Sequence, residues 1–315
     1  MEIKPININS KEYLDFIEEK ASVYNTPEWI SLYQKDCIVM GVHENNTLIA
    51  VFNTFVFKKA KLQFFIPPPF MPDCALVTVN KVDPKQITAA ITNYIEDQSL
   101  KIKYSLMRFS LSYKYLDAFE SLNLKGFQKK WNHTYVLDIS KTNDVQSLYA
   151  AKRRQQIRRA IKDGLQVQQI FDMNLVFDLV KKTFERQGKS INEDFIKKIV
   201  FNYANEKNSY AFASVLNSQY SVVYFCIHHH DEAFYLLGGY DEKNKHIGAG
   251  PMAMNACIEH AKKIGITTFD FEGSMEPNIE KYFKEFGGIK KIYLCYEKIS
   301  RLGKLIMKIK KLTKS

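Results

Sequence analysis

The sequence is most informative at Lys245-His246-Ile247-Gly248-Ala249-Gly250, a turn between a predicted strand and a predicted helix. Strand-forming residues fill Ala233–Tyr240 before the turn, and apolar residues recur at helical spacing after it as far as Lys263. Gly265 ends this helix, and Thr267–Glu272 predicts a second strand. The resulting β-loop-α-β unit predicts an α/β domain in the C-terminal half of the chain.

Strands and helices are predicted on both sides of this unit. After Ser140 the pattern predicts a helix over Asp144–Asp163, with Gly164 as its stop, and an antiparallel meander from Tyr210 to Tyr240. Upstream, it predicts helices after Ser10 and at Pro27 and Pro84–Leu100, and strands at Cys37–His43, Leu48–Phe57, Tyr104–Leu111 and Phe127–Ile139. We therefore expect two α/β (α+β) domains, at residues 1–140 and 141–297, followed by a tail at 298–315.

Composition and charge narrow the class of protein. The chain has 315 residues, of which 46% are hydrophobic and 25% charged, as is typical of a globular protein. Five widely spaced cysteines without a CxxC pair indicate free thiols, and the sequence shows neither a signal peptide nor a long apolar run. A cytoplasmic location is the resulting expectation.

Positive charge is concentrated in two places. The net charge is +11, yet Lys152–Lys162 holds six basic and no acidic residues, and Lys298–Ser315 holds seven and none. The rest of the chain is slightly acidic. The tail alternates basic with aliphatic residues, which predicts a basic amphipathic helix that lies on an anionic membrane surface, contacts RNA or packs on the body.

Glycines at a helix start permit anion binding. First-turn amides have no internal partners and carry the positive end of the helix dipole, so small residues let anionic oxygens approach the backbone. Pro251 suits this first turn but removes one amide donor. Taken alone, Gly248-Ala249-Gly250 favours a structural turn over a binding site.

Other stretches carry a family resemblance that covers almost the whole chain. They are, in order, Tyr24–Trp29, Arg154–Gly164, Leu237–Asp241, Phe269–Ser274 and Tyr282–Gly288. Together with the glycine turn, they resemble the GNAT-fold acyltransferase superfamily, and within it the double-GNAT acetyltransferase-domain proteins of the FemABX type. Lys245 stands where the GNAT motif has arginine or glutamine.

This resemblance implies two GNAT-like domains, each a mixed, mostly antiparallel sheet flanked by helices. It implies a transferase that moves an acyl group to an amine, with acyl-CoA or aminoacyl-tRNA as the donor and, in Fem-type relatives, a peptidoglycan precursor as the acceptor. Donor-binding residues would be Lys245, Ile247, Gly248, Ala249 and Gly250, and Trp29 would contact substrate. An amphipathic tail on the inner face of the membrane would suit a lipid-linked acceptor.

Candidate catalytic groups lie near the turn. Alternation along Thr267–Glu272 puts Asp270 and Glu272 on one strand face, and a carboxylate there can take a proton from an attacking amine. Glu272 is favoured because it stands at the strand's C-terminal end, although ion pairs would explain both residues. Tyr240 is a candidate proton donor to the leaving group, with a buried structural tyrosine as the alternative.

Cationic residues are candidates for holding substrate anions. Arg154, Arg158 and Lys162 follow each other at helical spacing, where like charges repel and an anionic partner would relieve the repulsion. Lys284 is a further candidate for a phosphate or carboxylate. A solvated helix face and a surface lysine are the corresponding alternatives.

Other chemistries find little support. Adjacent histidines at 228–230 point to opposite strand faces, and no carboxylate or cysteine cluster is spaced to complete a metal site, so no metal is assigned. A protein that has lost catalysis, and contacts nucleic acid or membrane through its basic helices, is the alternative to an enzyme.

Overall fold

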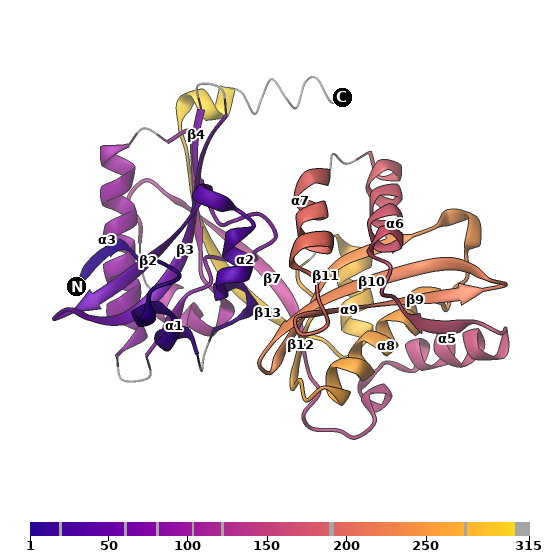
Figure 1. Cartoon of the computed structure of the whole chain (residues 1–315). Helices are drawn as coiled ribbons and strands as arrows, with labels where there is room; N and C mark the ends of the chain where they lie inside the picture. The colour runs from indigo at the N-terminus through magenta and orange to yellow at the C-terminus, as the bar shows by residue number, and fades with distance from the viewer. Residues whose placement is uncertain are drawn as a thin grey trace. The chain divides into compact units, whose positions relative to one another are not determined.

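The computed structural model describes residues 1–18, 21–59, 62–79, 82–102, 104–120, 123–188, 192–273 and 276–305 (Figure 1). Two compact units share the chain: Met1–Asn132 with Ile292–Ser315, and His133–Lys291. Division near residue 140 was expected from the sequence, but two strands, β7 (Gln128–Asp138) and β13 (Ile289–Ile299), each contribute residues to both units.

The N-terminal unit is a mostly antiparallel sheet flanked by helices. Its strand order is β1 (Glu2–Pro5), β2 (Cys37–Glu44), β3 (Thr47–Lys59), β4 (Leu62–Ile66), β6 (Leu106–Ser110) and the end of β13, with β5 (Val77–Thr78) beside β3. Within this unit, β4 and β6 pair in parallel. Its helices are α1 (Lys11–Ile17), α2 (Pro27–Ser31), α3 (Pro84–Lys101) and α4 (Leu116–Glu120). Ile87, Ile91 and Ile95 of α3 are fully buried in the core.

The strands of the C-terminal unit are also mostly antiparallel. Their order is β7, β12 (Thr268–Asp270), β11 (Glu232–Tyr240), β10 (Gln219–His229), β9 (Ser209–Leu216) and β8 (Gln166–Gln169), and within this unit β11 and β12 pair in parallel. Its helices are α5 (Ala151–Lys162), α6 (Met173–Arg186), α7 (Glu193–Lys197), α8 (Ala249–Lys263) and α9 (Pro277–Glu285). The expectation of a mixed, mostly antiparallel sheet with flanking helices is confirmed in each unit.

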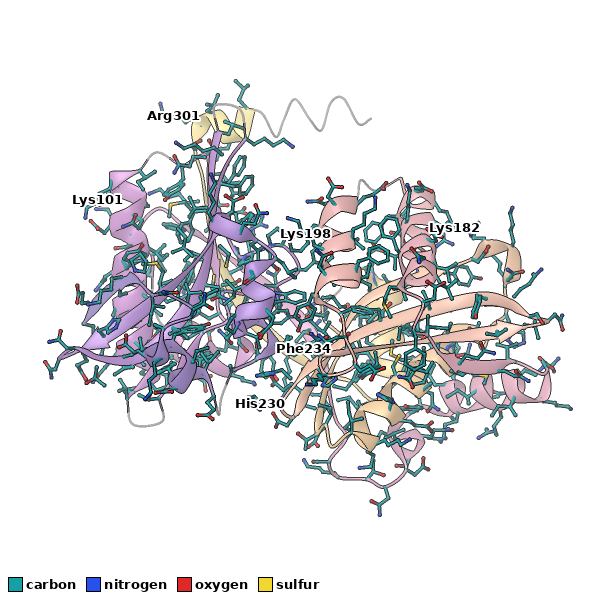
Figure 2. The ribbon with its side chains drawn as sticks, in the orientation of Figure 1. Lys101, Lys182, Lys198, His230, Phe234 and Arg301 are labelled. Atoms are coloured by element: carbon teal, nitrogen blue, oxygen red, sulfur yellow. The ribbon has the colours of Figure 1, made fainter. Side chains whose placement is uncertain are left out.

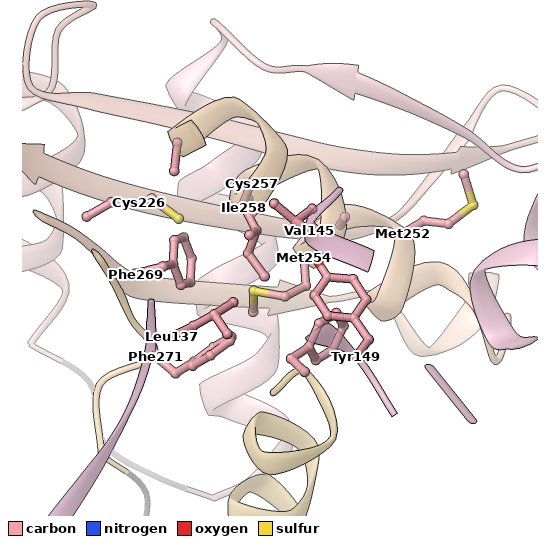
Figure 3. Close-up of a cluster of buried hydrophobic side chains, with 14 of the residues drawn as sticks. Leu137, Val145, Tyr149, Cys226, Met252, Met254, Cys257, Ile258, Phe269 and Phe271 are labelled. Carbon is pink, nitrogen blue, oxygen red and sulfur yellow. The ribbon is translucent and has the colours of Figure 1, made fainter. Parts of the chain in front are cut away.

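The core beside α8 fixes the position of the glycine turn. Cys257 and Ile258 of α8 pack with Cys226 of β10 and Phe269 of β12, and all four side chains are fully buried (Figure 3). On β11, α6 packs so closely that a Cβ at Gly239 would lie 2.6 Å from the Leu179 backbone. These contacts hold α8 and α6 against the sheet, and Ala249 and Ala253 at the start of α8 are fully buried in the same core.

The expected helix over Asp144–Asp163 is wrong in its first third. A 3₁₀ turn over Val145–Leu148 gives way to extended backbone at Tyr149 and Ala150, and α5 begins only at Ala151. Tertiary contacts override the helical pattern: the Tyr149 ring packs 4.8 Å from that of Phe286, and the Ala150 amide donates to the Glu285 carbonyl at 2.9 Å. The interruption creates a new helix N-terminus.

Two smaller expectations also need correction. Strands β4 and β5 flank the proline-rich loop without having been predicted, and β13 continues through Lys298 and Ile299, where the tail helix was expected to begin. Residues 301–305 are helical, and the rest of the predicted tail helix lies outside the described residues. None of the described helices is both long and apolar enough to cross a membrane.

Figure 2 shows His230 at the β10–β11 turn, where it is exposed and adopts a positive φ of 49°. In the described part of the chain, no three His, Cys, Asp or Glu side chains are grouped as metal ligands would be.

Candidate active site

The parallel strands β11 and β12 separate at the candidate site. Their pairing covers Glu232 to Phe234 opposite Thr268 to Asp270, and it stops there. Beyond it, β11 continues to Tyr240 with its register skipping Leu236, whereas the Phe271 amide donates to Tyr135 of β7 at 2.9 Å. The strands therefore open toward the end of the sheet at which α8 begins (Figure 1).

Gly248 is required for packing at this opening. It is the N-cap of α8, and a Cβ on it would lie 2.5 Å from the Ala160 Cβ and 2.6 Å from the Gln156 carbonyl oxygen, both in α5. Such distances leave no room for a side chain. The glycine turn is therefore seated directly on the basic helix.

His246 already uses two amides of the turn. Its Nδ1 accepts a hydrogen bond from the Gly248 amide at 3.1 Å, and its carbonyl accepts one from the Ala249 amide at 3.1 Å. Its Nε2 lies 3.1 Å from Asp163, whose pKa is lowered by its hydrogen bonds with Arg159 and His246. Pro251 has no N–H, so within the first turn of α8 the Gly250 amide is the donor left open to a ligand.

Tyrosine hydroxyls surround Gly250. A Cβ there would lie 3.0 Å from the Tyr224 hydroxyl and 3.2 Å from the Tyr282 hydroxyl, and these two oxygens are 3.3 Å apart. The Tyr235 ring lies edge-on to Tyr224 at 4.9 Å, with its hydroxyl over Gly238. Burial raises the pKa of Tyr224 to about 12 and raises that of Tyr282 well above its ordinary value. Both hydroxyls therefore stay protonated and can donate.

Arg153 joins the tyrosines to α9. Its guanidinium lies 4.2 Å from the Tyr282 ring centroid, a cation–π distance, and 2.8 Å from the Glu285 carboxylate in an ion pair. Gln156 accepts a further hydrogen bond from it at 2.7 Å. Arg153 is therefore a buried arginine, at 8% exposed.

The two candidate carboxylates lie at the end of β12 and just beyond it, in different settings. One Asp270 oxygen accepts the Thr134 hydroxyl and the Glu272 amide, the latter at 2.8 Å. Glu272 lies beyond the strand end, which falls at Asp270, and adopts a left-handed φ of 58° that is uncommon for a side-chain-bearing residue. Asp270 thus fixes the local backbone, and Glu272 is half-buried at the edge.

The other residues predicted around the turn are dispersed. Lys245 is exposed and lies 3.4 Å from Glu242, while Ile247 is exposed. The Tyr240 ring lies beneath Arg186, at 5.3 Å from its guanidinium carbon. Trp29 is fully buried in the N-terminal unit, edge-on to Tyr24, which favours a packing role.

The predicted cations differ in accessibility. Arg154 is half-buried and donates to the Tyr149 carbonyl, whereas Arg158 is exposed on α5. Lys284 lines a pocket beside the start of α5. Sequence reasoning did not single out Tyr224, Tyr235 or this pocket. All three depend on elements that meet only in the fold.

Known proteins place this arrangement in a family context. Residues 151–284 match the acetyltransferase (GNAT) domain family, so the resemblance predicted from the sequence is confirmed. Across 93% of this chain and 97% of its own, the crystal structure of FemX has the same fold, with a TM-score of 0.68 at 14% identity. No curated protein matches the sequence.

Two further solved structures share the fold. A tandem GNAT protein from the clavulanic acid biosynthesis pathway has a TM-score of 0.56 at 10% identity, over 94% of this chain and 97% of its own. The C-terminal domain of a putative lysylphosphatidylglycerol synthetase from Agrobacterium fabrum has a TM-score of 0.58 at 11% identity, over 94% of both chains. The chain therefore contains two GNAT-like domains.

Proposed function

We propose that the protein is an N-acyltransferase that moves an acyl or aminoacyl group from a CoA thioester or an aminoacyl-tRNA to an amine. One observation carries the proposal: within the part of the chain that matches the GNAT acetyltransferase domain, two tyrosine hydroxyls meet at Gly250, where β11 and β12 part. The reactive carbonyl of the donor would lie at this opening.

Each step of the transfer has a candidate group. The amine attacks the donor carbonyl and must lose a proton, for which Glu272 is the proposed base, held in place by Asp270 through the Glu272 amide. The leaving thiolate or alkoxide must gain a proton. Tyr224 and Tyr282 suit that role better than Tyr240, because their hydroxyls touch the first turn of α8.

The glycine turn offers few backbone amides for binding the pyrophosphate of coenzyme A, which is how the GNAT motif binds this cofactor. With the Gly248 and Ala249 amides bonded to His246 and no amide donor on Pro251, the first turn of α8 keeps only a reduced set of donors for a pyrophosphate, among them the Gly250 amide. An aminoacyl-tRNA donor carries its phosphates at other positions relative to its ester than coenzyme A does relative to its thioester. It therefore stays as a candidate donor beside acyl-CoA. A peptidoglycan precursor as the amine acceptor rests on the family resemblance alone.

A thermal-shift screen with coenzyme A, acyl-CoA and aminoacyl-tRNA tests the proposal at its first step. We expect one donor class to raise the melting temperature, and mass spectrometry to detect an acylated amine when that donor is mixed with a panel of amines. Glu272→Gln should bind the same donor and form little product. A chain that bound no donor, or bound nucleic acid without any transfer, would instead be a GNAT-fold binding protein.

A further inference from the structure

A pocket of about 540 Å³ opens between the start of α5 and one face of α9. Its wall includes Tyr135, Ala150, Glu280, Lys281, Lys284 and Glu285. All of these belong to the C-terminal unit, and none belongs to the glycine turn.

The pocket carries uncompensated positive charge. Glu280 accepts hydrogen bonds from Lys290 at 2.8 Å and from Tyr135 at 2.7 Å, and Glu285 is paired with Arg153. Lys281 and Lys284 have no ion-pair partner in the part of the chain that the structure describes. Two ammonium groups are thus left to meet a ligand.

The N-terminus of α5 adds backbone donors to this wall. Ala150 is the N-cap and supplies no capping side chain, so the amides of Ala151 and Lys152 have no hydrogen-bond partner among the described residues. The first turn then places Lys152, Arg153 and Arg154 at the positive end of the helix dipole, where acidic residues are normally favoured. Such a helix start is unfavourable by itself and becomes favourable with an anion bound.

Arg153 supplies an independent sign of a missing ligand. Its side chain is nine-tenths buried, yet its Nε–H has no hydrogen-bond partner among the described residues. The guanidinium reaches the pocket wall through Glu285 and the tyrosine cluster through Tyr282. A buried donor without an acceptor is costly unless a ligand or water completes it.

We propose that the N-terminus of α5, with Lys281 and Lys284, binds a phosphate group of a nucleotide-bearing ligand. Free amides at a helix N-terminus and lysine ammonium groups are the donors that proteins use for phosphate. The inference deepens the proposed function by placing the donor's phosphate beside α5 rather than at the α8 turn. Only the link to a donor rests on that function, because phosphate binding is measurable without any transfer.

Ala150→Asp is the sharpest test. Ala150 is exposed, and aspartate is a strong N-cap residue, so this variant should fold and melt at a higher temperature than the wild type. Its carboxylate would occupy the free amides and repel phosphate. In calorimetric titrations with coenzyme A and with a single-stranded RNA trinucleotide, the dissociation constant of whichever ligand the wild type binds should rise at least about tenfold.

Two matched comparisons separate charge from folding. Ala150→Asn caps the helix without a charge and should weaken binding less than Ala150→Asp. Lys281→Ala/Lys284→Ala should also weaken it about tenfold, whereas Lys207→Ala/Lys263→Ala, which removes the same charge from other exposed positions, should not. Wild-type affinity in Ala150→Asp, or no phosphate ligand bound by the wild type, would overturn the proposal.

The ligands also distinguish the source of the phosphate. Loss of affinity on going from coenzyme A to dephospho-CoA would indicate a terminal phosphate, and binding of the trinucleotide but not coenzyme A would indicate a nucleic-acid phosphodiester. If phosphate binds but no acyl transfer is found, the proposed function fails and the site stands. If Ala150→Asp still transfers the acyl group and binds the donor with unchanged affinity, the proposed function stands and the phosphate site fails.

Discussion

The starts of α8 and α5 differ in how many backbone amides they leave open to an anion. Their sequences indicate the opposite order, because only α8 begins with an anion-binding glycine motif. The α8 start has the glycines of an anion-binding motif, yet His246 accepts two of its amides and Gly248 is packed against α5. The α5 start has no motif, yet its amides are open, its first turn is basic and its N-cap lines a pocket. Glycine at a helix start thus serves close packing as readily as ligand binding.

This difference assigns two tasks to two places, with chemistry at the start of α8 and anion binding at the start of α5. The α8 end brings tyrosine hydroxyls to the opening between β11 and β12, which suits chemistry at a carbonyl. The α5 end brings amides and lysines to a pocket, which suits the binding of an anion. Arg153 touches both, through Tyr282 on one side and Glu285 on the other.

The largest expected effect concerns chemistry at the α8 end. Tyr224→Phe/Tyr282→Phe removes both hydroxyls near Gly250, and the transfer rate should fall by about 10² to 10⁴, as for loss of a general acid. Donor affinity should change little. Tyr220→Phe, which removes a hydroxyl of the same strand that donates to Gln168 instead, is the control. Equal turnover in the double variant and the control would remove the tyrosines from the mechanism.

The next effect concerns packing beneath the turn. Gly248→Ala drives a methyl group into Ala160 and the Gln156 carbonyl, and we expect it to destabilise the protein by about 1–3 kcal/mol. Gly250→Ala meets only the tips of two tyrosine side chains, so it should cost less stability but lower activity. Urea unfolding of both variants measures the contrast, and equal midpoints would show that Gly248 is not fixed by packing.

A smaller effect concerns the histidine that occupies the turn. His246→Ala removes the acceptor of the Gly248 amide, and we expect a loss of about 1 kcal/mol. Hydrogen exchange at the Gly248 amide should become faster in this variant. Unchanged protection there would mean that packing alone, rather than His246, shields the amide.

The smallest expected effect is a pH dependence of the protein's stability that arises from Glu280. Hydrogen bonds from Lys290 and Tyr135 lower the pKa of Glu280 to about 2, from an ordinary 4.5. A lowered pKa in the folded state stabilises the protein above pH 4.5, and this contribution is lost as the pH falls toward 2. Wild type should therefore be more stable than Glu280→Gln at pH 7, with the gap in urea midpoint closing below pH 4.5. A gap that did not depend on pH would rule out the carboxylate charge as its cause.

Local patterns predicted most of the fold because periodicity and turn residues agree with it. Apolar spacing in α3 and α8 coincides with the buried faces that the structure shows, and the meander predicted from Tyr210 to Tyr240 is the antiparallel set β9–β11. The pattern failed at Tyr149–Ala150, where a ring contact with Phe286 and a hydrogen bond to Glu285 outweigh helix propensity.

The candidate site was predictable only where its residues are neighbours in sequence. The turn at 248–250 and the carboxylates after β12 were found in that way. Tyr224, Tyr282 and Arg153 come from three separate elements, and Ala150 became an N-cap only because the expected helix was interrupted. Long-range packing, which a single sequence does not display, decides both the meeting of these three side chains and the N-cap position of Ala150.

Donor affinity compared between the two helix starts tests this division of work most directly. The dissociation constant of the stabilising donor should be measured by calorimetry for wild type, Ala150→Asp and Tyr224→Phe/Tyr282→Phe under one salt condition. We expect Ala150→Asp to lose at least about tenfold in affinity while the tyrosine variant binds like the wild type. Normal affinity in Ala150→Asp, with binding lost in the tyrosine variant, would place the donor's anion at the α8 turn and contradict the proposal.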